Sequence, residues 1–292
     1  MSHLGQILSR LPGEVRQPIE GLPDEIKNSM EEIRIQLNRS IRITAGNREI
    51  VLATQVSDNL FDTILNNLLD YSIYAYEDEI AKGFITIEGG HRVGLCGRAV
   101  LENNHVRLLK DISSLNIRRS HQIPGCADKV YDQIVEPKFG VHNTVIVSPP
   151  RCGKTTILRD MVRLLSNRGF RVGVCDERSE IAGMYQGNPS YDLGPRTDVL
   201  DSCPKAEGMR MLIRSMAPDV LVTDEIGRPE DMDALETGLC AGVKIITTIH
   251  GSDFRDLKQS NLYPLIEKKA IERIIYLSNV PATGTIREVQ HV

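Results

Sequence analysis

The stretch that decides the fold runs from Val145 to Thr156 and reads Val-Ile-Val-Ser-Pro-Pro-Arg-Cys-Gly-Lys-Thr-Thr. A short β-branched run enters a turn, the turn ends in Gly-Lys-Thr, and an amphipathic run follows. This order predicts a strand, a phosphate-binding loop and a helix, which is the arrangement that a P-loop requires. Successive backbone N–H groups and the free helix N-terminus would form a cradle for an anion.

Within this loop, Lys154 is expected to reach the β- and γ-phosphates of a nucleotide, and the Thr155 hydroxyl is expected to ligate Mg²⁺. The usual pattern opens with Gly where this chain has Ser148, and two prolines follow. Because proline donates no N–H, the backbone donors must come from Cys152–Thr156. The expected nucleotide contacts are Pro150, Arg151, Cys152, Gly153, Lys154, Thr155 and Thr156.

Composition limits the classes of protein that this chain can represent. Its 292 residues are 41% apolar, enough for one large domain or two ordinary ones. A net charge of −4 and only 4% aromatic residues argue against a nucleic-acid partner. Six cysteines without a C-x-x-C pair indicate reduced thiols. With no signal-peptide pattern and no apolar run near ~20 residues, we expect a cytoplasmic protein that can associate peripherally with a membrane complex.

The pattern of the chain changes near residue 120. Residues 1–120 mix short alternating runs, such as 32–37 and 40–44, with a helical run at 58–70, which predicts an α+β domain. From 121 to 292 strands alternate with helices, which predicts a parallel sheet covered on both faces. The expected strands there are 144–147, 170–175, 220–223, 243–248 and 274–277.

Polar residues follow the first four of these strands, at the edge where open α/β sheets bind ligands. Asp224 is placed to hold Mg²⁺ beside Thr155, and Glu225 to orient or deprotonate an attacking water. His250 follows another strand and is either structural or a hydrogen-bond partner of the γ-phosphate. Asp176–Glu180 is a second acidic cluster, and a solvated charge run is its alternative interpretation.

In order along the chain, these pieces resemble the secretion (traffic) ATPases of type II and type IV systems. Residues 208–226 resemble that family's arginine helix and Walker B strand, and 235–250 resemble the segment that ends at its conserved histidine. The resemblance puts Glu180 at the family's catalytic glutamate. Two departures are Ser148 in the P-loop and Asp-Glu, rather than Gly-Glu, after the Walker B strand.

A branch of this family that acts in endospore formation is the closer match. Its characteristic segments here are 109–118, 149–150, 176–181 and 196–201. The resemblance implies a RecA-like P-loop NTPase core at 121–292 and a smaller α+β regulatory and assembly domain at 1–120. It also implies ATP and Mg²⁺ as cofactors and a homo-oligomer, with a hexameric ring as the family's form. Membrane-embedded channel proteins of the same operon are the implied partners, on the mother-cell side.

The resulting hypothesis is an ATPase that supplies conformational work to a channel between mother cell and forespore. Its catalytic residues would be Lys154, Glu180, Glu225 and His250, and the sequence does not say which glutamate is the base. Arginines that could neutralise transition-state charge within or across subunits are Arg118, Arg119, Arg210 and Arg214. The alternatives are a nucleic-acid-translocating ATPase with the same core and a structural switch that binds ATP without hydrolysing it.

Overall fold

The computed structural model describes residues 3–137 and 140–292, and it divides into two compact units. Unit 1 contains the chain up to His121 together with Gly183–Ser190, and unit 2 contains Gln122–Ala182 and Tyr191–Val292. The chain therefore passes between the units at three points. Assigning regulation and assembly to the N-terminal part stays a prediction.

Unit 1 is built on a six-stranded antiparallel sheet in the order β3-β2-β1-β6-β5-β4. The strands are β1 Met30–Gln36, β2 Ser40–Ala45, β3 Arg48–Gln55, β4 Phe84–Ile87, β5 His91–Glu102 and β6 His105–Arg118. Alternating apolar residues such as Ile33 and Ile35 of β1 and Ile41 and Ile43 of β2 are buried in one core. The hairpin signals at 32–52 correctly predicted this part of the sheet.

Helices supply the rest of the unit 1 core. They are α1 His3–Ser9, α2 Gly13–Glu20, α3 Asp24–Ser29, α4 Asp58–Leu68, the 3₁₀ turn η1 Ile73–Tyr76 and α5 Glu77–Ala81. The predicted helix α4 begins after Ser57, whose hydroxyl accepts a hydrogen bond from the Leu60 N–H. Its Phe61 and Ile64 are buried against the sheet. The sequence analysis named no helix before residue 30.

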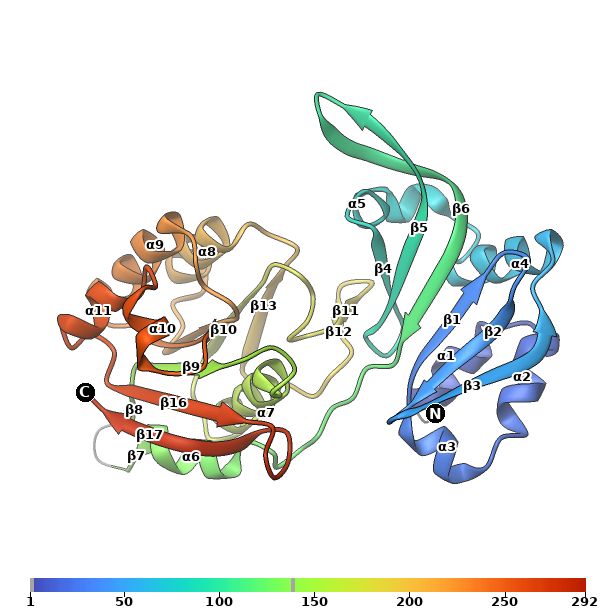
Figure 1. Cartoon of the computed structure of the whole chain (residues 1–292). Coiled ribbons are helices and arrows are strands. Elements are labelled where there is room, and N and C mark those ends of the chain that lie inside the picture. The colour runs from blue at the N-terminus through green and yellow to red at the C-terminus, as the bar shows by residue number, and fades with distance from the viewer. Residues whose placement is uncertain (1–2, 138–139) are drawn as a thin grey trace. The chain divides into compact units, whose positions relative to one another are not determined.

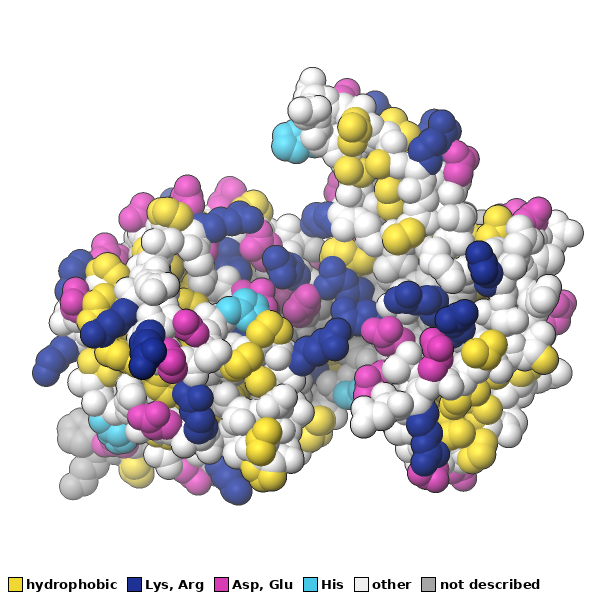
Figure 2. Space-filling model, in the orientation of Figure 1, with side chains coloured by type: hydrophobic (Ala, Val, Ile, Leu, Met, Phe, Trp, Pro, Cys, Tyr) yellow, Lys and Arg dark blue, Asp and Glu magenta, His cyan; other side chains and the backbone are white. Residues whose placement is uncertain are grey.

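Strands β5 and β6 form a long hairpin whose outer half extends beyond the other strands of unit 1 (Figure 1). The sequence suggested separate strands at 105–109 and 114–119, but the structure has one strand. A bulge at Gly97 and Asp111 joins the two parts. Glycine fits at position 97 because a Cβ there would lie only 2.6 Å from the Lys110 carbonyl oxygen. Figure 2 shows apolar side chains exposed on this hairpin, and Leu101 is 61% exposed.

Residues 183–190 form a small hairpin of strands β11 Met184–Tyr185 and β12 Asn188–Pro189 that belongs to unit 1. Its Tyr185 hydroxyl donates a hydrogen bond to Asp70 at 2.8 Å and accepts one from Arg10 at 2.7 Å. Arg10 and Asp70 also form an ion pair with an N–O distance of 2.6 Å. This network attaches the hairpin to the N-terminal segment of the chain.

Unit 2 contains a seven-stranded sheet in the order β13-β10-β14-β15-β9-β16-β17. All pairs are parallel except β16–β17. The strands are β9 Thr144–Ser148, β10 Val172–Asp176, β13 Thr197–Asp201, β14 Val220–Thr223, β15 Lys244–His250, β16 Arg273–Ser278 and β17 Thr285–His291, and a separate pair is β7 Val135–Glu136 with β8 Gly140–Val141. The five strands expected here are present, and β13 and β17 were not expected.

Helices cover both faces of this sheet, as the alternation of strands and helices predicted (Figure 1). They are α6 Asp128–Ile134, α7 Lys154–Asn167, α8 Lys205–Met216, α9 Pro229–Cys240, α10 Phe254–Lys258 and α11 Tyr263–Glu267. Val145 and Val147 of β9 pack in the core that also contains Leu212 of α8 and Leu235 of α9. Helix α7 lies on the opposite face. Across residues 3–137 and 140–292, no helix combines the length and apolarity needed to span a bilayer.

Candidate active site

Strand β9, the loop after it and helix α7 adopt the strand–loop–helix arrangement that the sequence predicts. All five residues of β9 are buried, and α7 begins at Lys154. Gly153 precedes the helix with φ +82°, a conformation that disfavours other residues. A Cβ there would also lie 3.1 Å from the Thr283 Cγ2 atom. Backbone conformation therefore favours glycine at this position, and the available space is limited.

The Lys154 ammonium is held inside the loop by main-chain carbonyls. Its Nζ donates to the carbonyl oxygens of Ser148 at 2.8 Å and Pro149 at 3.0 Å, and it lies 3.2 Å from His250 Nδ1. The residue is 6% exposed, and burial lowers the pKa of its ammonium. Lys154 thus has partners within the protein, and a bound phosphate would have to replace some of them.

His250 links Lys154 to Glu225. Since Lys154 Nζ donates to Nδ1, the other ring nitrogen carries the proton and donates to Glu225 Oε1 at 2.8 Å. Arg178 contacts the second oxygen of Glu225 at 3.3 Å. The histidine and glutamate that sequence analysis placed at two strand ends therefore meet, because β14 and β15 are adjacent parallel strands.

Asp224 lies at the carboxyl end of β14 and is 2% exposed. Burial raises its pKa to about 6; Lys205 opposes the rise, and Glu180 and Glu225 add to it. Thr155 is half-buried in the first turn of α7. A carboxylate and a hydroxyl are oxygen ligands that suit Mg²⁺, which usually takes one or two protein ligands and completes its shell with phosphate and water. Among the described residues, no three His, Cys, Asp or Glu side chains form a metal cage by themselves.

The loop after β10 is fixed by two buried side chains. Asp176 accepts hydrogen bonds from the backbone N–H groups of Glu180, Ile181 and Ala182 at 2.8–2.9 Å. Arg159 of α7 donates to the carbonyl oxygens of Glu180 and Ile181 at 2.6 and 2.8 Å. Burial raises the pKa of Asp176 to about 7 even though these N–H donors oppose it. The acidic cluster is therefore a built loop rather than a solvated charge run, with Glu180 near Asp224.

Three of the four candidate arginines, Arg118, Arg119 and Arg214, have ordinary side-chain partners within their own units. In unit 1, Arg118 pairs with Glu32 at 3.4 Å, and Arg119 donates to the Lys27 carbonyl oxygen at 2.8 Å. In unit 2, Arg214 donates to the Arg210 carbonyl oxygen, one turn earlier in α8. Their role in neutralising phosphate charge stays a prediction.

Sequence reasoning missed Arg159 and Lys205. Arg159 lies among buried apolar positions of α7. Because a buried arginine needs a partner, its place in the apolar pattern could have marked it as a structural or functional residue. Lys205 follows Cys203-Pro204 in a segment without recognisable spacing.

Beside Glu225 and His250, a cavity of about 380 Å³ is lined by Gly227 and the residues Gln259, Ser260 and Asn261. The remaining loop positions differ in exposure: Pro150 and Arg151 are exposed, Cys152 is buried, and Thr156 is half-buried.

The parallel sheet, the loop before α7 and the polar residues at the strand ends define a RecA-like protein of the P-loop NTPase class. Within that class, the chain belongs to the family described as sporulation stage III, protein AA, whose model matches residues 2–291. Stage III sporulation protein AA of Bacillus subtilis (strain 168) is 41% identical to it over 98% of this chain and 94% of the relative.

Solved structures with low sequence identity share the fold. The ATPase DotB of Legionella pneumophila aligns with a TM-score of 0.58 at 16% identity, over 86% of this chain and 73% of DotB. The pilus retraction motor PilT, solved with bound ADP, aligns with a TM-score of 0.56 at 12% identity, over 88% of this chain and 77% of PilT. These comparisons confirm the expected resemblance to secretion ATPases and the RecA-like fold.

Proposed function

We propose that this chain is a Mg²⁺-dependent ATPase that performs conformational work in sporulation. The observation that carries this proposal is the hydrogen-bonded series Lys154–His250–Glu225, which joins the phosphate loop to a carboxylate beside the buried Asp224. A nucleotide-binding switch needs the loop alone. A carboxylate connected to the phosphate-binding lysine through a histidine supports hydrolysis.

In this proposal, Lys154 and the backbone N–H groups of Cys152–Thr156 bind the phosphates. Thr155 and Asp224 would hold Mg²⁺, which withdraws charge from the phosphate oxygens when it is bound. Glu225 accepts a proton from the attacking water, or Glu180 does so from the neighbouring loop. The reaction breaks the bond between the β–γ bridging oxygen and the γ-phosphorus, and water supplies the new oxygen.

His250 has two tasks in this scheme. With Nδ1 accepting from Lys154 and Nε2–H donating to Glu225, the ring keeps these two side chains apart and aligned. When Lys154 moves to a phosphate, Nδ1 loses its donor, so the ring can respond to the presence of nucleotide. This supports the earlier interpretation of His250 as a γ-phosphate sensor.

The proposed place of action is supported by membership of the family rather than by the site. We propose that the protein forms a homo-oligomer, as a hexameric ring, on the mother-cell side of membrane-embedded channel proteins of its operon. An arginine from a neighbouring copy, with Arg118, Arg119, Arg210 and Arg214 as candidates, would then neutralise transition-state charge. Negative net charge and few aromatic residues favour this function over translocation along nucleic acid.

The test is phosphate release by the purified full chain with Mg·ATP, measured across protein concentration and with and without nucleic acid. We expect turnover that rises with protein concentration, does not respond to nucleic acid and falls ~10²-fold or more in K154A. Removing Lys154 also leaves two carbonyls without a donor at a cost of ~1–3 kcal/mol, so K154Q and a thermal melt accompany it. Tight ATP binding without phosphate release would establish the switch instead, and stimulation by nucleic acid would establish the translocase.

A further inference from the structure

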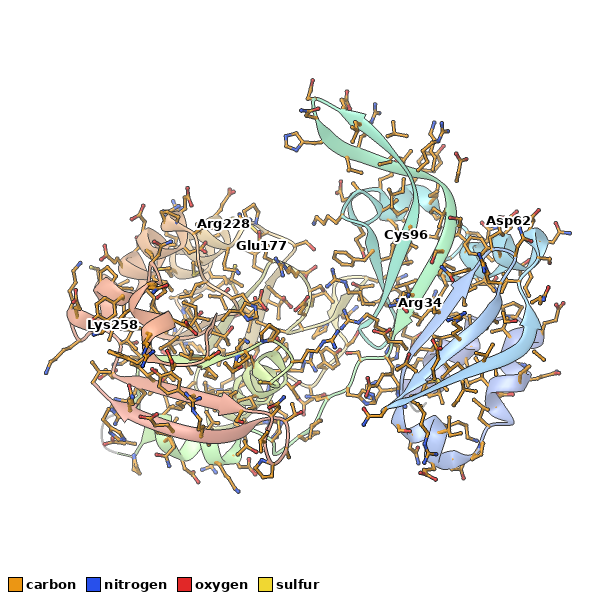
Figure 3. All side chains as sticks on the ribbon, in the orientation of Figure 1. Arg34, Asp62, Cys96, Glu177, Arg228 and Lys258 are labelled. Atoms are coloured by element: carbon orange, nitrogen blue, oxygen red, sulfur yellow. The ribbon has the colours of Figure 1, made fainter. Side chains whose placement is uncertain are left out.

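Lys205 is a lysine buried among acidic groups at the carboxyl edge of the unit 2 sheet. It is the first residue of α8, and its side chain is 9% exposed. Its Nζ donates to the Glu225 carbonyl oxygen at 3.0 Å and lies 3.7 Å from Glu177 Oε2 and 3.9 Å from Asp224 Oδ1. Figure 3 labels Glu177 at this edge together with Arg228, which lies 4.0 Å from its other carboxylate oxygen.

An ammonium at this position is unfavourable on local grounds. The N-terminus of a helix carries partial positive charge, so a cation in the first turn is disfavoured. Burial adds a desolvation cost that only close partners offset. The packing of α8 against the sheet is apolar, through Met209 and Leu212, and needs no charge at its first residue. Lys205 is therefore held where it is by the acidic groups and the carbonyl that it contacts.

The carbonyl that Lys205 contacts belongs to a residue with an uncommon backbone conformation. Glu225 has φ +42°, a strained conformation that few non-glycine residues adopt. Its N–H donates to Thr248 Oγ1 at 2.8 Å, and its carbonyl accepts from Lys205. Both peptide groups of Glu225 are thus fixed, one from β15 and one from α8. This conformation directs the carboxylate toward His250.

We propose that Lys205 is a positioning residue for ATP hydrolysis: it holds the main chain of Glu225 in the conformation that presents the carboxylate to the reacting water, without itself binding nucleotide. The proposal rests on the proposed function. It assigns to Lys205 an effect on turnover rather than on affinity, because its donor is engaged with the Glu225 carbonyl rather than with the phosphate loop.

The experiment compares wild type with K205M, K205R and the control K268M in the full chain. Lys268 lies in the same unit, is 65% exposed and pairs with Glu236 at 2.9 Å, so K268M removes an ion-paired lysine away from the site. Phosphate release gives kcat and KM, equilibrium titration gives the Kd for Mg·ATP, and a thermal melt reports folding. We expect kcat of K205M to fall ~10–10²-fold with KM and Kd within about threefold. K205R should recover part of the loss, and K268M should behave as wild type.

A double-mutant cycle with E225Q separates positioning from an independent effect. If Lys205 acts through Glu225, K205M should reduce the residual kcat of E225Q less than about twofold. Should K205M not fold, K205Q takes its place, because the amide nitrogen is one atom closer to the main chain and cannot reach the Glu225 carbonyl. The same fall in kcat is expected for it.

Three results would overturn the inference in an active wild-type protein. One is a kcat of K205M or K205Q within twofold of wild type. Another is a tenfold or larger rise in KM and Kd with kcat retained, which would make Lys205 a nucleotide-binding residue. The third is a full multiplicative loss in the E225Q background. A wild-type protein without Mg·ATP hydrolysis would instead remove the proposed function itself, and the inference with it.

Discussion

Replacing Glu225 by glutamine tests the proposed catalytic carboxylate with little change of shape. The glutamine amide oxygen can still accept from His250 Nε2, whose present distance to Glu225 Oε1 is 2.8 Å. The ion pair with Arg178 is lost, but its N–O distance is 3.3 Å and the Arg178 side chain is 59% exposed. An exposed pair of this kind contributes ~0.2–1 kcal/mol, so the fold should change in stability by less than about 1 kcal/mol.

The expected effect on turnover is much larger, because an amide cannot take the proton of the attacking water. Loss of a general base costs ~10²–10⁴-fold. At 1.36 kcal/mol for each factor of ten, this is about 2.7–5.4 kcal/mol on the activation barrier. The predicted barrier change thus exceeds the predicted change in stability several-fold, and the two can be distinguished in one protein preparation.

The assay is steady-state phosphate release at saturating Mg·ATP, with ATP affinity and melting temperature measured in parallel. E236Q is the matched control, since Glu236 is a surface carboxylate of α9 that pairs with Lys268. An E225Q protein with more than half of the wild-type turnover would refute the assignment. A large fall in E180Q without one in E225Q would identify Glu180 as the base.

Two further predictions concern stability. The buried His91 ring accepts from the Ser120 N–H, and burial lowers its pKa to about 4, so the unfolded chain takes up a proton between pH 6.5 and 4 that the folded chain does not. Stability should therefore be lost as pH falls through this window, by up to about 3 kcal/mol; H91Q should flatten the change in melting temperature between pH 7 and pH 5, and an unchanged slope would contradict the argument. A Cβ at Gly208 of α8 would lie 2.6 Å from Cys175 Sγ, so G208A should destabilise by ~1–3 kcal/mol. G238A in α9 is the control: a Cβ there would lie 3.3 Å from Ile213 Cδ1, the end of a flexible side chain, so the stability should change little. Equal melting temperatures for the two variants would refute this.

The features that could be predicted from sequence are those set by short segments. The P-loop was predictable because Gly153, Lys154 and Thr155 lie between a β-branched run and an amphipathic run. Asp224 and His250 were predictable as strand-end residues because parallel strands put their carboxyl ends on one edge. The contact between Glu225 and His250 is a consequence of this topology.

The features that sequence reasoning missed depend on distant partners. Lys205 has no local signal, since what holds it is the main chain of Glu225, 20 positions later. Apolar and polar residues alternate only weakly along β17, and the strand is defined by its antiparallel pairing with β16. In β6, Asp111 adopts φ +48° opposite Gly97. From the sequence alone, this position is interpreted as the end of a strand. Pairing and bulges of this kind are set by the neighbouring strand rather than by the residues themselves.

The internal hydrogen bonds of Lys154 have a thermodynamic consequence for nucleotide exchange. Its ammonium donates to the Ser148 and Pro149 carbonyls, so this charge has partners within the protein. Phosphate binding is then an exchange of partners rather than a gain of new ones, and only the difference between the two sets contributes to affinity. During product release, the Ser148 and Pro149 carbonyls compete with the product phosphate for the Lys154 ammonium. If the protein hydrolyses ATP as proposed, this exchange favours moderate affinity and rapid release over storage of a bound nucleotide.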